Sequence, residues 1–208
     1  NLVITGHQNG VEVWLSIGGA GYSDVYPSMA ANSQYRATFV ENVRSFAQQS
    51  CIDGVDIDWE SWSGSASGTV NPQESALLTT MLSELRAVLA PLNIKLSTDV
   101  YPSDWNGRHY EAAIITHIDQ LNVMAYDFTG SWSPAGNHSS YNDTRYSVNY
   151  WNNKVSSQPG YSSKKMILGV PFYGKDFSQG AAAITYKDIL ARYPATAAEN
   201  ATSQIEKI

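Results

Sequence analysis

Hydrophobic positions along the chain alternate between short runs that are typical of strands and longer stretches with helical spacing. Apolar runs predict five strands, at residues 11–17, 51–60, 94–101, 118–125 and 166–172. Apolar residues three or four positions apart predict one helix capped by Ser33 and one that starts at Asn71-Pro72 with Asn71 as its cap, with shorter helices at 111–116, 146–155 and 185–193. Strands that alternate with helices predict a parallel α/β sheet, as in a (β/α) barrel.

The second apolar run carries regularly spaced acids, in Asp53-Gly54-Val55-Asp56-Ile57-Asp58-Trp59-Glu60. A period of two places Asp56, Asp58 and Glu60 on one face, with successive Cα atoms about 6.7 Å apart. At this spacing the charges interact, so at least one carboxyl should keep its proton above the usual pKa near 4. A carboxyl that keeps its proton can act as a general acid. The alternative is an amphipathic strand whose acidic face meets water, but Tyr126-Asp127 and Tyr173 also fall at the predicted carboxyl ends of strands.

Composition narrows the classes of partner. The 208 residues include 43% hydrophobic and 15% charged residues, which is typical of one globular domain. The net charge of −6 disfavours a nucleic-acid partner, and no apolar run approaches the roughly 20 residues that span a membrane. The four histidines lack metal-ligand spacing, so we expect ordinary surface residues and no metal or cofactor. Cys51 is expected to be a buried thiol.

Four motifs, in order, resemble those of the family 18 glycoside hydrolases, the chitinases and their relatives. The acidic run resembles the DxxDxDxE signature, and Ser16-Ile17-Gly18-Gly19 resembles the SxGG motif of barrel strand three. Residues 124–132 resemble strand six, and residues 168–174 resemble strand seven. The resemblance implies a (β/α)8 TIM barrel.

The resemblance also implies a role for each site residue. Glu60 would be the general acid and Asp58 would orient the substrate's N-acetyl group. Asp56 would share a proton or hydrogen bond with Asp58, and Tyr126 would bind the acetamido oxygen. Further residues are expected to bind substrate, namely Met124, Asp127, Trp132 and Tyr173. Four more are expected to be structural at the site, namely Ser16, Gly18, Gly19 and Asp53. Trp62 and Trp105 are further candidates for stacking on sugars.

Against the family pattern, the barrel is incomplete, because the sequence has no counterpart of strands one, two and eight. We therefore expect residues 1–208 to be part of a catalytic barrel within a longer chain, with residues 175–208 as the possible start of a small insertion before strand eight. The strand-eight tryptophan of the family would lie outside this chain.

The activity implied is hydrolysis of β-1,4-linked N-acetylglucosamine polymers or oligomers by a retaining mechanism in which the substrate's acetamido group is the nucleophile. The alternatives are an endo-β-N-acetylglucosaminidase acting on N-glycans and a non-catalytic chitin-binding lectin. A metal-dependent enzyme is disfavoured, since Asp56 and Glu60 are about 13 Å apart along an extended strand. The resemblance implies an extracellular protein whose partner is chitin or its oligosaccharides, with no obligate protein partner, although the sequence contains no signal peptide.

Overall fold

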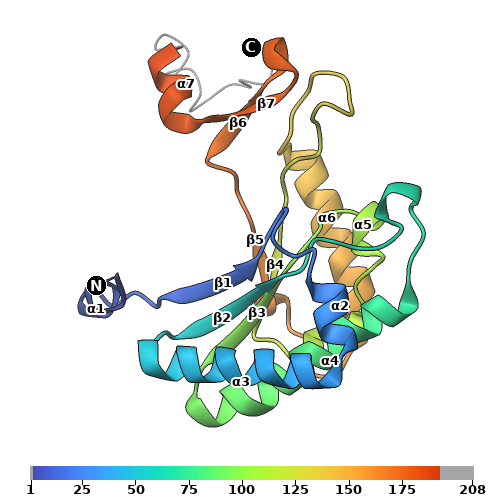
Figure 1. Cartoon of the computed structure of the whole chain (residues 1–208). Coiled ribbons are helices and arrows are strands. Elements are labelled where there is room, and N and C mark those ends of the chain that lie inside the picture. Colours follow the sequence, from blue (N-terminus) through green and yellow to red (C-terminus); the bar gives the residue numbers. More distant parts are fainter. Residues whose placement is uncertain (1, 193–208) are drawn as a thin grey trace.

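A five-stranded parallel sheet forms the centre of the computed structural model, which describes residues 2–192 (Figure 1). The strands are β1 (Trp14–Gly18), β2 (Gly54–Asp58), β3 (Lys95–Val100), β4 (Gln120–Val123) and β5 (Met166–Leu168). Their spatial order is the same as their order along the chain, as in successive βα units of a (β/α)8 barrel. The five strands form an open arc of such a barrel, with β1 and β5 as its edges.

Helices cover one face of the sheet (Figure 1). The helices on this face are α2 (Tyr26–Ala31), α3 (Ser33–Ser50), α4 (Pro72–Leu89) and α6 (Tyr141–Val155). The short helix α5 (Asp104–Gly107) and the 3₁₀ turns η1 (Ser65–Ser67), η2 (Ala90–Leu92), η3 (Ala112–Thr116) and η4 (Ser163–Lys165) belong to the connecting segments. Val55 and Ile57 of β2 are fully buried against leucines of α4 in one hydrophobic core. The period of two in β2 therefore separates a packed apolar face from an acidic one.

The longest apolar segment is α4 with η2, and it belongs to the core. Residues Pro72–Leu92 are long and apolar enough to cross a membrane by length and composition alone, contrary to the expectation from the sequence. However, the helix buries Leu78, Leu82 and Leu85 completely against the sheet and neighbouring helices. Its start is as predicted, with the Asn71 side chain accepting a hydrogen bond from the backbone N–H of Gln73.

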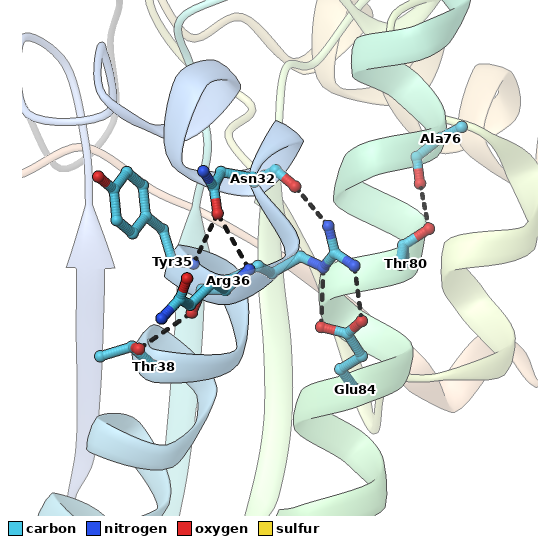
Figure 2. Close-up of polar contacts among 9 residues, drawn as sticks. Asn32, Tyr35, Arg36, Thr38, Ala76, Thr80 and Glu84 are labelled. Carbon is cyan, nitrogen blue, oxygen red and sulfur yellow. Dashed lines mark hydrogen bonds and ion pairs between the residues drawn. The ribbon is translucent and has the colours of Figure 1, made fainter.

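Helix α3 is capped and tied to α4 by polar contacts (Figure 2). The N-cap is Asn32 rather than the predicted Ser33, because the Asn32 side chain accepts hydrogen bonds from the backbone of residues 34 and 35. Arg36 makes a bidentate ion pair with Glu84 of α4, at 2.8 and 2.9 Å, and also donates to the carbonyl of Ala30. This pairing fixes the two helices side by side on the sheet.

Several predicted boundaries are wrong. Helix α6 begins at Tyr141, five residues early, because Ser140 caps it through the backbone N–H of Asp143. Strand β5 ends at Leu168 rather than at 172, and residues 111–116 form a 3₁₀ turn. Cys51 is exposed, since it ends α3 in a left-handed conformation instead of starting the next strand.

A small second sheet stands apart from the main one (Figure 1). Strands β6 (Tyr173–Asp176) and β7 (Ala182–Thr185) form an antiparallel hairpin that contains the turn η5 (Phe177–Gln179) and is followed by α7 (Tyr186–Arg192). The hairpin was not predicted, nor was the N-terminal helix α1 (Leu2–Gln8). The predicted insertion at 175–208 overlaps this hairpin, but residues 193–208 lie outside the described part, so that division of the chain stays a prediction.

Candidate active site

Asp56 lies at the centre of the polar face of the sheet. The register pairs it with Ser16 of β1 on one side and Ser97 of β3 on the other. Both hydroxyls donate to its carboxylate, at 2.7 Å from Ser16 and 2.6 Å from Ser97, and the Asn122 side chain of β4 donates at 3.1 Å. Three neighbouring strands therefore hold this carboxylate in one orientation.

Asp58 follows at the carboxyl end of β2, where the chain of β1 approaches closely. The N–H of Gly19 donates to the Asp58 carbonyl at 2.9 Å. Gly18 has φ +116°, and a Cβ there would lie 2.1 Å from the same carbonyl oxygen, so only glycine fits. Burial, with the charges of Glu60 and Asp56, raises the pKa of Asp58 to about 7. Its Oδ1 is buried and has no hydrogen-bond partner in the described chain.

Glu60 lies two residues past the strand, in a cleft of about 670 Å³. The buried hydroxyl of Ser23 accepts hydrogen bonds from the N–H groups of Glu60 and Ser61, at 3.0 and 3.1 Å, and so fixes the turn. Burial raises the pKa of Glu60, and the charge of Asp127 acts in the same direction. A half-buried carboxyl whose pKa is raised holds its proton to a higher pH than a solvated glutamate does, which suits a general acid beside a cleft.

Across the cleft, Tyr126 and Asp127 follow β4. Burial raises the pKa of Tyr126 to about 12, so its hydroxyl keeps its proton and can donate a hydrogen bond. Burial would also raise the pKa of Asp127, but contacts with His138, Lys175 and Tyr173 lower it to about 2. The Lys175 ammonium lies 2.9 Å from Asp127 and stabilises its charged form, whereas burial disfavours the charged forms of Asp58 and Glu60.

The aromatic candidates divide into exposed and buried rings. Trp105 and Trp132 line the cleft together with Met124, and their rings are 51% and 68% exposed, respectively. Trp62 is buried and stacks on Trp59 at 5.1 Å, so it is a core residue and cannot stack on a sugar. Tyr173 packs edge to face on Tyr126 at 6.2 Å but lines a separate cavity of about 510 Å³.

Asp53 lies at the opposite end of β2 from the acids. Its carboxylate accepts from the backbone N–H of Val13 at 2.6 Å and pairs with His7 at 2.9 Å. These contacts hold the start of β1 beside β2, which agrees with a structural role away from the cleft.

Comparisons with known proteins agree with this geometry. The model of the glycosyl hydrolases family 18 matches residues 3–206. The chain belongs to this family. Its relatives include a "chitinase-like effector" of Moniliophthora perniciosa, 32% identical over 92% of this chain and 48% of the relative, and "Chitinase 1" of Aphanocladium album, 30% identical over 81% and 42%.

Solved structures of family members share the barrel. The Ostrinia furnacalis Group II chitinase catalytic domain 2, solved with (NAG)5, superposes with a TM-score of 0.71 at 28% identity and covers 83% of this chain and 48% of that one. The chitinase domain of the Clostridium difficile spore coat protein CotE gives 0.74 at 28% identity, over 92% and 57%. This family 18 chain therefore spans about half the length of the proteins that it matches.

The sequence motifs missed several side chains of this family 18 site. Ser23 and Asn122 contact the acids from other elements, and His138 and Lys175 contact Asp127 from segments that had no predicted role. His138 had been taken for an ordinary surface residue. A signal did exist for Ser97 and Asp99, because they alternate with buried residues along β3 as the acids do along β2.

Proposed function

We propose that this chain carries the catalytic centre of a glycoside hydrolase that cleaves β-1,4-linked N-acetylglucosamine chains, with Glu60 as general acid and the substrate's acetamido oxygen as nucleophile. The observation that carries the proposal is that the acidic face of β2 leads to Glu60, which lines one cleft together with Tyr126 and Asp127. Glu60 and Asp58 have raised pKa values through burial, and Asp127 is held ionised by Lys175.

The chemistry follows from where each group lies. Glu60 protonates the glycosidic oxygen as the bond breaks. The unpartnered Oδ1 of Asp58 is free to engage the acetamido group, whose carbonyl oxygen attacks the anomeric carbon, while the Tyr126 hydroxyl donates to that group. Asp56 is fixed by its three donors two residues before Asp58, and its charge contributes to the raised pKa of Asp58. The exposed rings of Trp105 and Trp132 offer apolar faces for sugar rings.

The comparisons support the substrate class. Several relatives are named chitinases, and a matching structure was solved with (NAG)5. The shared motifs suit an endo-β-N-acetylglucosaminidase equally, and a lectin on the same fold remains a non-catalytic alternative. Secretion fits such a substrate and is likewise a proposal.

The test uses a protein in which the five parallel strands of this chain are part of a complete, closed barrel. It compares three substrates: chitin oligosaccharides, glucosamine oligomers without acetyl groups and a high-mannose glycopeptide. We expect cleavage of the first only. Glu60→Gln keeps the size of the side chain but removes the transferable proton, so kcat on a chitin oligomer should fall by about 10²–10⁴-fold while binding persists.

Each alternative has its own outcome in the same assay. Cleavage of the glycopeptide alone would select the endoglycosidase, and binding without turnover by the unmodified protein would select the lectin. Efficient cleavage at a glucosamine site would exclude the acetamido nucleophile. A Glu60→Gln variant that keeps more than about a tenth of kcat would exclude Glu60 as the acid, because general acid catalysis is worth far more than that.

A further inference from the structure

A fourth carboxyl, that of Asp99, lies among the acids of β2. Asp99 is on β3. The parallel register pairs Ile57 with Thr98, so one residue further along the two strands Asp99 lies beside Asp58. Alternation along β3 buries Leu96, Thr98 and Val100 completely and turns Ser97 and Asp99 to the acidic face. Neighbouring strands are about 4.8 Å apart, so the Asp99 and Asp58 carboxyls cannot both be ionised without a large cost.

The contacts of Asp56 set the direction of hydrogen bonding. Its two oxygens already accept from Ser16, Ser97 and Asn122, so Asp56 is the acceptor at the centre of the group. Asp99 contacts both the Asp56 carboxyl and Asn122. A carboxyl that bonds to an acceptor carboxylate must supply the proton itself.

We propose that Asp99 is a positioning residue of this site. It is a neutral carboxylic acid that donates a hydrogen bond to Asp56, so that no second negative charge lies beside Asp58. The claim about protonation stands on the geometry of the sheet. Its consequence for catalysis rests on the proposed function, because only then must Asp58 and Glu60 hold their protons at working pH.

The remaining surroundings supply no cation for Asp99 within the described part of the chain. The titratable groups that face it are Asp56 and Asp58 on β2 and the Tyr126 hydroxyl after β4, with Glu60 further along. On the same face β1 contributes Ser16 and β5 contributes Ile167, neither of which can be charged. In agreement, burial and the neighbouring acids raise the pKa of Asp99 to about 9.

The sign of the pH effect follows from the folded and unfolded states. An aspartate is ionised above about pH 4 in the unfolded chain, whereas the folded chain keeps the Asp99 proton to about pH 9. Between these values unfolding releases that proton, so the folding equilibrium constant should fall by about tenfold per pH unit on account of this group.

The first experiment measures stability between pH 7.5 and 8.5, above the pKa of Asp58, in the wild type, Asp99→Asn and the exposed control Asp188→Asn. The amide introduced by Asp99→Asn mimics the neutral acid at all pH values. We expect the pH slope of the folding equilibrium constant to be shallower by about tenfold per unit in Asp99→Asn and unchanged in the control. Equal slopes in wild type and Asp99→Asn would overturn the proposal, because a purely structural role moves stability without changing the proton count.

The second experiment needs no variant. Carboxyl ¹³C NMR of the unmodified chain, labelled at aspartate, should show one carboxyl that stays protonated above pH 7.5. If every aspartate carboxyl is ionised at that pH, the proposal fails. Neither measurement involves turnover, so failure of the chitin assay together with a protonated Asp99 would refute the proposed function alone.

Discussion

The close approach of β1 to Asp58 gives the sharpest test of how this site is built. In the wild type only a glycine hydrogen faces the Asp58 carbonyl, and a Cβ at Gly18 would also lie 3.0 Å from the Tyr26 ring. Gly18→Ala therefore combines two costs, the positive φ of +116° and a collision with backbone that cannot rotate away. The change should loosen the strand end that carries Asp58.

A matched control separates the two costs. Gly21, in the loop after β1, has φ +77° but has no atom within 4 Å of the position of a Cβ. Gly21→Ala should therefore destabilise only through backbone strain, by about 1–2 kcal/mol. Gly18→Ala adds overpacking of about 1–3 kcal/mol, which gives a total of about 2–5 kcal/mol.

The assay is denaturant unfolding of both variants, analysed as the shift of the midpoint at constant slope. In parallel, NMR should follow the Asp58 carboxyl, whose pKa near 7 depends on burial. We expect Gly18→Ala to lie about 2 kcal/mol below Gly21→Ala and the pKa of Asp58 to move toward its ordinary value as water enters. If the two variants have equal stability, the contact between Gly18 and the Asp58 carbonyl is not tight, and this account of the SxGG motif is wrong.

Two further predictions concern the ion pairs of Arg36 and of Asp127. Arg36→Ala should lower the unfolding free energy by about 1–2 kcal/mol, because it leaves Glu84 and the Ala30 carbonyl unpaired. The control Arg44→Ala should change the unfolding free energy little, because its partner Glu41 is exposed. Equal denaturation midpoints for the two variants would contradict this prediction. The folded pKa of Asp127 is about 2, below its unfolded value, so the stability that this group contributes is present above about pH 4 and is lost as the pH falls toward 2. In thermal melts, Lys175→Met should flatten this loss of stability in acid, and the exposed control Lys187→Met should not. Parallel curves of melting temperature against pH for the two variants would refute the role of Lys175.

Local periodicity explains which parts of the fold could be predicted from the sequence. The alternation in β2 assigned Val55 and Ile57 to the core and Asp56 and Asp58 to the opposite face, and both assignments are confirmed by burial and hydrogen bonding. The start of α4 was equally visible, because a capping Asn before Pro acts within one turn. Such features depend on neighbours along the chain.

Contacts between distant segments could not be predicted in this way. Ser23 reaches Glu60 across 37 residues, and Lys175 reaches Asp127 from a hairpin that no apolar alternation announced. The hairpin turns at Gly180 with φ +69°, a signal too weak to separate it from an ordinary loop. The prediction that Trp62 stacks on a sugar was wrong, because a tryptophan near a strand end can equally pack in the core, as Trp62 does on Trp59.

The proton positions at this site depend on the register of the whole sheet. The donors to Asp56 come from β1, β3 and β4, so its orientation requires four strands in one alignment. A slip of one residue in any of them would turn its serine or asparagine to the opposite face and leave the carboxylate without that donor. Asp58 ends the strand and Glu60 lies two residues beyond it, and burial is the largest cause of the raised pKa of each. Along β2 and the turn after it, the acids thus change from a carboxylate fixed by hydrogen bonds to carboxyls whose charged form is disfavoured by burial.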